Sequence, residues 1–185
     1  MADGLFYRDL RQPVVVADQG SIAPGTTETT LWATGATSPT ILPANYWWVG
    51  KTVKITAAFK WTSGTAGNIT FGMSYGAANN PACKVNSTAI AAIASVGPFT
   101  VFAQGYATCR SIGTAGTLSL WGSAQFPIGL VLSTGQTNFT FPVAGVSVVS
   151  TVDTTVATNA VMFHAIRSAG TDAVVCVGLT FEALN

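Results

Sequence analysis

His164 is the only histidine of the chain and the first residue to consider for catalysis. A histidine that acts as a general base needs an acid or a nucleophile within hydrogen-bonding distance. Asp153, Asp172 and Cys176 are the residues that could supply one, and a Cys176–His164 pair would be a nucleophilic thiol with its base. His164 lies within the apolar run 161–167, however, which favours a packed or interfacial histidine. We therefore assign no catalytic residue.

The carboxylates and cysteines match no common catalytic or metal-binding pattern. Four of the seven carboxylates fall in the first 28 residues, and no cluster among them is typical of a calcium loop or of the paired acids of a glycosidase. Cys83, Cys109 and Cys176 fit no zinc spacing, and we expect free, mostly buried thiols. A Cys83–Cys109 disulfide stays open as an alternative. We predict neither a metal ion nor a cofactor.

Five tryptophans are the remaining candidates for ligand contact, because their rings form stacking platforms for sugars and bases. Trp61 continues the apolar face of an expected strand, so we assign it to the core. Tyr46, Trp47 and Trp48 follow Pro43 in a loop-like segment just before a strand. Adjacent aromatic residues in such a place plug one end of a sandwich, form a subunit interface or contact a glycan.

Charge and hydropathy argue against nucleic acid and membrane as partners. Lys51, Lys54 and Lys60 indicate one solvated strand face and not the basic patch of a nucleic-acid-binding protein. The most apolar stretch, 89–103, is interrupted by Ser95, Gly97, Pro98 and Thr100, so it does not have the pattern of a membrane-spanning helix. The N-terminal residues carry acids and lack an apolar core, so we expect no signal peptide and synthesis in the cytoplasm.

Alternation with period two dominates the sequence and indicates strands with one buried face. In the segment 51–61 the inward set is Val53, Ile55, Ala57, Phe59 and Trp61. The segment 68–75 repeats the pattern with Ile69, Phe71, Met73 and Tyr75. Because the turn-rich segment 62–67 joins the two, we predict that they form a hairpin.

A second unit of the same kind follows. The segment 99–109 alternates, and Gly-Thr-Ala-Gly at 113–116 repeats the four residues found at 64–67. Near the C-terminus, 161–167 is apolar on both faces, like a central or interface strand, and 173–181 alternates cleanly. We predict an all-β fold: an antiparallel β-sandwich, jelly-roll-like, with about eight strands.

The first twenty residues differ from the remainder. They hold five of the fifteen charged residues, and we predict an extended N-terminal arm at 1–20 before a sandwich domain at 21–185. Residues 14–17 are a candidate first strand. Arg8, Asp9 and Arg11 are the candidate residues for docking the arm on a partner, since segments that order on binding can cover a large area.

Charged residues make up only 8% of the chain, against about 25% in ordinary soluble domains. Uncharged Thr, Ser, Asn and Gly side chains can keep part of such a surface wetted. The rest is expected to be covered by neighbouring subunits, because obligate interfaces are apolar like a core.

Several short sequence segments resemble small structural proteins that are encoded among the virion genes of tailed bacteriophages, particularly phages of actinobacteria. They are Thr26–Trp32, Ile41–Asn45, Gly50–Ala57, Gly64–Phe71 and Thr151–Thr155, in that order. The resemblance runs from about residue 20 to the end of the chain. It implies a jelly-roll-type subunit on the capsid exterior, either a decoration or a minor capsid protein, and it supplies no catalytic residue.

The resemblance therefore implies a non-enzymatic decoration protein that forms a homotrimer and binds the phage major capsid protein. A tail or fibre component that binds the host surface is the first alternative. A free-standing carbohydrate-binding sandwich, or a jelly-roll enzyme, is the second.

Overall fold

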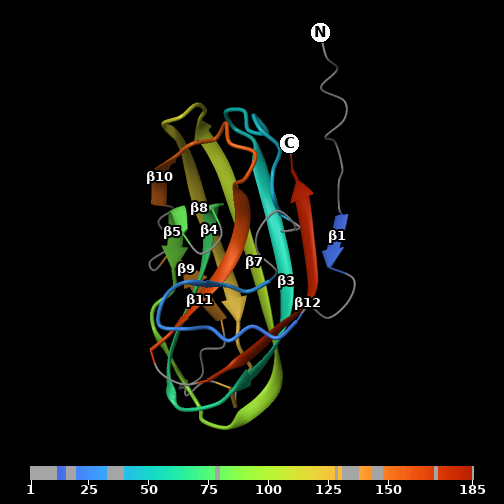
Figure 1. The fold of residues 1–185 in the computed structure, drawn as a ribbon, viewed down its shortest axis with the longest axis vertical. Helices are drawn as coiled ribbons and strands as arrows, with labels where there is room; N and C mark the ends of the chain where they lie inside the picture. Colours follow the sequence, from blue (N-terminus) through green and yellow to red (C-terminus); the bar gives the residue numbers. More distant parts are fainter. Residues whose placement is uncertain are drawn as a thin grey trace.

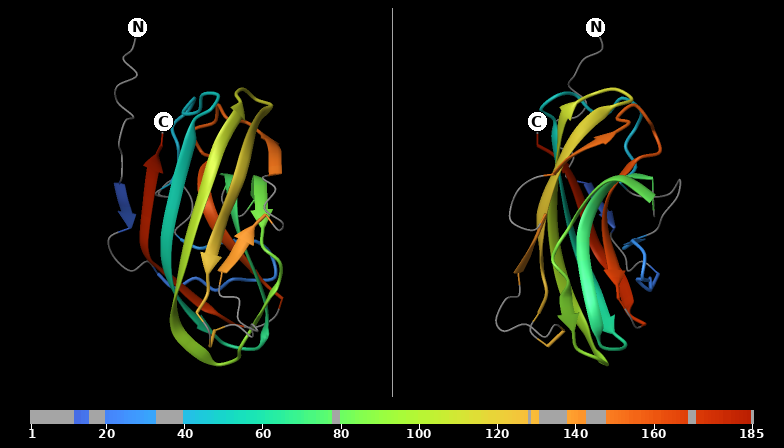
Figure 2. Two further views of the ribbon diagram at one scale, coloured as in Figure 1. Left: turned by 180° about the vertical axis from the view of Figure 1, so that it is seen from behind. Right: turned by 90° about the vertical axis from the view of Figure 1, so that its left-hand side faces the viewer.

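The computed structural model of the chain describes residues 12–15, 20–32, 40–77, 80–127, 129–130, 138–142, 148–168 and 171–184. These residues form two antiparallel sheets that lie face to face, so the predicted β-sandwich is confirmed (Figures 1 and 2). No helix in this part of the chain is long and apolar enough to cross a lipid bilayer. The sandwich positions every candidate site.

The first sheet, sheet A, runs in the order β1-β12-β3-β7-β8-β10, with β9 beside β8. Its strands are β1 (Gln12–Val15), β3 (Thr52–Ser63), β7 (Val96–Ser111), β8 (Gly116–Gln125), β9 (Asn138–Phe141), β10 (Val148–Val152) and β12 (Ala173–Ala183). The second sheet, sheet B, runs in the order β2-β11-β4-β5, with β6 beside β4. Its strands are β2 (Thr29–Thr30), β4 (Gly67–Ala77), β5 (Asn80–Asn86), β6 (Ile90–Ala92) and β11 (Ala160–Arg167).

The prediction of about eight strands matches the longer ones. Among the described residues, eight strands have five or more residues, while β1, β2, β6 and β9 are shorter. The neighbouring strands β3 and β4 lie in different sheets, and so do β11 and β12. Because β12 pairs with β3 while β11 pairs with β4, two ribbons of chain run side by side through both sheets. This winding gives the sandwich its jelly-roll-like character.

The core lies between the sheets and is formed by the side chains that the alternation predicts. Val53, Ile55, Phe59 and Trp61 of β3 are buried, as are the four predicted residues of β4. Aromatic rings join the two layers: Phe59 contacts Phe71 with ring centroids 6.2 Å apart. Each such ring contributes about 2 to 3 kcal/mol through removal from water.

One predicted hairpin is wrong and the other is confirmed. The turn at 64–67 does not join paired strands, because β3 pairs with β12 and β7 while β4 pairs with β11 and β5. The chain passes there from one sheet to the other, in an arch. The same four residues at 113–116 close a true hairpin, in which β7 pairs with β8. The residues of a turn indicate that the chain reverses there, but they do not determine which strand the following strand pairs with.

Strand β11 is buried on both faces, as its continuous apolar pattern predicts. Its outer side is covered because the segment 20–32 crosses over sheet B, as the blue chain in Figure 1 shows. This segment leaves the edge of sheet A at Ile22, which exchanges backbone hydrogen bonds with Val174. It then runs along β11, where Arg167 N donates to Gly25 O and Leu31 N donates to Phe163 O.

The N-terminal prediction is tested in part. Strand β1 lies at Gln12–Val15, two residues before the predicted start, and it pairs with β12 at the edge of sheet A. The sheet therefore begins inside the segment that was predicted to be an arm. Arg8, Asp9 and Arg11 lie outside the described residues.

Candidate functional site

His164 is a buried residue on the outer face of sheet B. It is paired in register with Gly72, where a Cβ atom would lie 2.6 Å from His164 Nε2, so glycine makes room for the imidazole. Its Nε2 lies 2.6 Å from Asn86 Oδ1 and 3.7 Å from Glu28 Oε1. Lys84 Nζ lies 3.1 Å from the same Glu28 oxygen. Three segments, 20–32, β5 and β11, thus meet at this residue.

Burial, together with a smaller effect of the nearby positive charge of Lys84, lowers the pKa of His164 to about 4. The imidazole is therefore neutral near pH 7, and its Nδ1 has no hydrogen-bond partner among the described residues. A neutral, enclosed ring fits the packed histidine favoured by the sequence.

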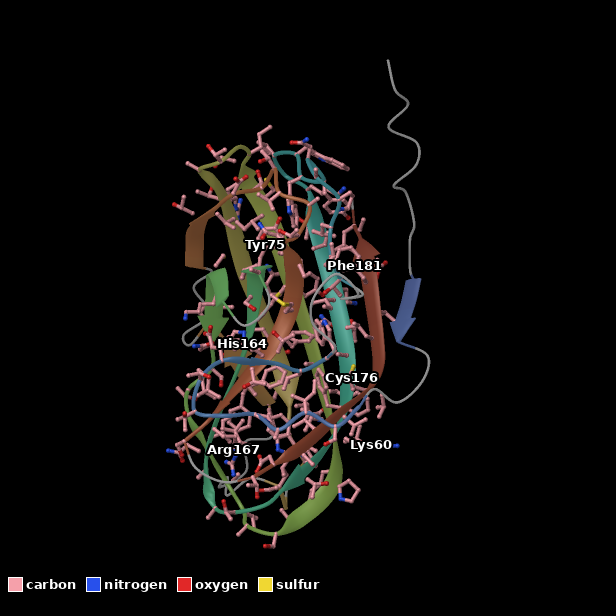
Figure 3. All side chains as sticks on the ribbon, viewed as in Figure 1. Lys60, Tyr75, His164, Arg167, Cys176 and Phe181 are labelled. Carbon is pink, nitrogen blue, oxygen red and sulfur yellow. The ribbon has the colours of Figure 1, made fainter. Side chains whose placement is uncertain are left out.

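Cys176 and His164 do not form a catalytic pair. Cys176 belongs to β12 of sheet A, whereas His164 belongs to β11 of sheet B (Figure 3). The Cys176 thiol points to Gly178 O at 3.7 Å, and burial raises its pKa to about 11. The thiolate, which is the reactive form, is therefore disfavoured. All three cysteines are buried and free, so the open Cys83–Cys109 disulfide is not formed.

The two acids considered as catalytic partners stabilise loops at opposite ends of the sandwich. Asp172 is buried: Oδ2 lies 2.9 Å from Arg167 Nε and accepts a 2.7 Å hydrogen bond from Trp61 Nε1. Asp153 accepts hydrogen bonds from the backbone N and the hydroxyl of Thr155, which lower its pKa. The length of β3 separates these ends by about 35 Å, whereas the carboxyl groups of a glycosidase lie within about 10 Å.

The aromatic residues at 46–48 differ in their exposure to solvent. Tyr46 and Trp47 are buried at one end of the core, and Trp47 packs edge-on against Tyr75 with centroids 5.6 Å apart. They plug the sandwich and offer no ring face to a glycan or to a neighbouring subunit. Trp48 alone is exposed. The local sequence does not distinguish the exposed Trp48 from the buried Tyr46 and Trp47, since all three are adjacent aromatic residues.

Lys51 is not a member of a solvated strand face, so that expectation is wrong. Its side chain is buried, and Nζ lies 3.3 Å from the ring centroid of Tyr46 and 3.8 Å from that of Trp48. Nζ also donates a hydrogen bond to Tyr46 O at 3.2 Å. Burial lowers the Lys51 pKa to about 8. The ammonium group thereby holds the exposed Trp48 ring against the end of the sandwich.

Four exposed apolar side chains gather at this same end, and we call them the end patch: Trp48, Val49, Ile112 and Leu184. Each is between 45% and 63% exposed. Backbone hydrogen bonds join their loops, since Gly50 N donates to Cys109 O and Leu184 N donates to Thr52 O. The loop before β3, the β7–β8 turn and the C-terminal end of β12 all lie toward the upper end of Figure 1.

Among the described residues, two further large apolar side chains are exposed, Phe102 and Trp121, and both lie on the outer face of sheet A. Trp121 is one of the five tryptophans considered from the sequence, whereas Phe102 was not singled out. A signal for them exists, because alternation places Phe102 opposite the buried Val101 and Ala103, and an aromatic residue on a polar strand face is unusual.

Among the described residues, no group of three or more His, Cys, Asp or Glu side chains is close enough to hold a metal ion. Comparison with known proteins adds no constraint: no family model, curated protein or solved structure gives a significant match to the chain. The candidate functional surfaces are therefore defined by geometry alone, as the end patch and the outer face of sheet A.

Proposed function

We propose that the protein is a non-enzymatic structural component of a bacteriophage particle, a decoration protein that self-associates on the outside of the capsid. The observation that carries this proposal is the end patch, which accounts for four of the six large apolar side chains that are exposed among the described residues. Burying such a patch against another protein removes apolar surface from water at about 25 cal/mol per Å².

The proposed occupant of the end patch is another copy of this chain. Trp48 and Val49 come from one segment, while Ile112 and Leu184 come from two others, so the patch is formed at the ends of strands and not on a sheet face. Three such ends can meet around a three-fold axis, where each patch is buried by its two neighbours. A homotrimer held in this way leaves the long faces of the sandwich available.

Attachment to the capsid is assigned to the N-terminal residues, with Arg8, Asp9 and Arg11 as the docking side chains and the major capsid protein as the partner. Strand β1 supports this arrangement, because it places the start of the fold at an edge of sheet A, from which residues 1–11 lead away in sequence. The resemblance to phage virion proteins points the same way.

Light scattering coupled to size-exclusion chromatography tests the self-association. The unmodified protein is expected to have three times the 19.0 kDa mass of the chain. Val49→Asp is expected to give the monomer, because a charge buried in an apolar interface is strongly unfavourable. Phe102→Asp is the matched control, since Phe102 is also more than half exposed but lies on the outer face of sheet A, and it should leave the trimer intact.

A stable monomer for the unmodified protein, or an unchanged mass for Val49→Asp, would contradict the trimer. Cryo-electron microscopy of the particle tests the location separately. Density for this sandwich on the tail alone would overturn the decoration role and would favour the tail or fibre alternative.

A further inference from the structure

The outer face of sheet A contains a groove of about 270 Å³ at the centre of the sheet. It is lined by Thr56, Phe102, Ala103, Gln104, Ser123, Gln125 and Asn138, which come from β3, β7, β8 and β9. The register brings them together in two adjacent rows: Gln104 pairs with Thr56 and Ser123, and Gln125 pairs with Phe102 and Asn138. The site is thus built on four paired strands and not on loops.

The polar lining consists of three amides and two hydroxyls. Each amide carries both a hydrogen-bond donor and an acceptor, and each hydroxyl does both. Gln104 is already oriented, because its Nε2 donates a 2.5 Å hydrogen bond to the Tyr106 hydroxyl. The side chains of Thr56, Ser123, Gln125 and Asn138 form no hydrogen bond within the described part of the chain, so they are available to a ligand.

One aromatic ring lies in the groove and two more lie beside it. Phe102 lies in the lining and is 55% exposed, so much of its ring is accessible. In the row next to that of Gln104, Tyr106 of β7 stacks on Trp121 of β8 with ring centroids 4.0 Å apart, and Trp121 remains exposed. Phe102 and Tyr106 are four residues apart, or about 13 Å along the strand, with the oriented Gln104 between them.

We propose that this groove binds a neutral glycan chain. Sugar rings present hydroxyls that both donate and accept, which matches amides and hydroxyls, and apolar C–H faces, which match exposed aromatic rings. None of the described lining residues is a lysine, arginine, aspartate or glutamate, which argues against a phosphate-rich or anionic ligand. The nearest lysine in register, Lys54, pairs with Tyr106 outside the groove. This inference does not rest on the proposed virion role.

Native affinity electrophoresis tests the proposal. The full chain is run in gels that contain dextran, galactomannan, mixed-linkage β-glucan or neutral arabinogalactan, and polygalacturonate serves as the anionic comparison. At least one neutral polysaccharide should retard the protein. Gln104→Ala and Gln125→Ala should each weaken that binding about fivefold, which corresponds to one hydrogen bond. Phe102→Ala should weaken it by a similar factor.

Thr100→Ala is the matched control, because Thr100 is exposed on the same strand and face but outside the groove, and it should bind like the unmodified protein. Thermal unfolding of every variant shows that the fold is intact, as expected for substitutions of half-buried or exposed side chains. Three results would overturn the proposal: no retardation by any neutral polysaccharide, retardation that the groove variants do not alter, or equal retardation by polygalacturonate. Val49→Asp should keep the binding site, which separates this test from that of the trimer.

Discussion

A buried neutral histidine makes the stability of this protein depend on pH. His164 is enclosed by Asn86, Gly72 and the segment that carries Glu28, and its pKa is lowered from 6.5 to about 4. The unfolded chain therefore binds a proton at a higher pH than the folded protein does. Between these two values the free energy of unfolding must fall as pH falls, because protonation favours the unfolded state.

We expect the free energy of unfolding to fall as the pH is lowered from about 6.5 toward 4, with a total His164 contribution of about 3 kcal/mol. His164→Gln retains a hydrogen-bonding side chain without a titrating group, so it should flatten the pH profile. Urea denaturation of both proteins between about pH 7.5 and 5 measures the difference. Since His164 is the only histidine of the chain, no second imidazole contributes in this range. Parallel profiles for the two proteins would show that the imidazole is not responsible.

At the scale of the elements, the repeated Gly-Thr-Ala-Gly segment shows how tertiary contacts assign different roles to one sequence. In the arch at 64–67, Gly64 N donates to Asp172 Oδ1 and Thr65 O accepts from Arg167 Nη2, so a buried ion pair fixes the crossing between sheets. In the hairpin at 113–116, the Thr154 hydroxyl bonds to Gly113 N instead. The two turns differ at their first glycine: Gly64 lies against the backbone of Thr171, whereas the Cβ position of Gly113 faces open space.

Alanine substitutions should reveal this difference. A Cβ atom at Gly64 would lie 1.7 Å from Thr171 O, so Gly64→Ala must displace backbone and should lower the free energy of unfolding by about 3 kcal/mol. At Gly113 a Cβ atom meets nothing within 4 Å, and only the φ of +114° disfavours alanine, for about 1 kcal/mol. Urea denaturation measures both values. A larger loss for Gly113→Ala would contradict the assignment of arch and hairpin.

For the molecule as a whole, the surface carries even fewer charged groups than the composition suggests, because some charged side chains are buried. Lys51, Arg167 and Asp172 are buried, so they do not contribute to the charge of the surface. The described surface offers instead an apolar end and an uncharged groove. This division lets the ends associate with one another while the outer face of sheet A stays free for a ligand, which makes the two proposals compatible.

Deleting residues 1–11 tests how the chain divides between attachment and folding. Strand β1 begins at Gln12, so the truncation spares every described strand, and the thermal unfolding temperature should change little. The truncated protein should lose attachment to capsids that lack the endogenous protein, measured by cosedimentation. Val49→Asp is a useful comparison, because it changes the oligomeric state and keeps Arg8, Asp9 and Arg11. Loss of the cooperative thermal transition would show that the removed residues belong to the fold.

The sequence by itself determined the fold class and the buried faces of the main strands. Alternation is a property of neighbouring residues, so the inward positions from Val53 to Trp61 and from Ile69 to Tyr75 could be predicted without knowing any partner strand. The double-sided burial of β11 followed in the same way from its uninterrupted apolar run.

Only the tertiary structure decided which strands pair and which residues are exposed. The arch at Gly64, the burial of Lys51 and Trp47, and the exposure of Trp48 all depend on segments far apart in the chain. The groove depends on register as well, since Gln104 and Gln125 become neighbours of Asn138 only when β7, β8 and β9 pair. Pairing is chosen by the summed burial of whole sheets, and local sequence does not encode that sum.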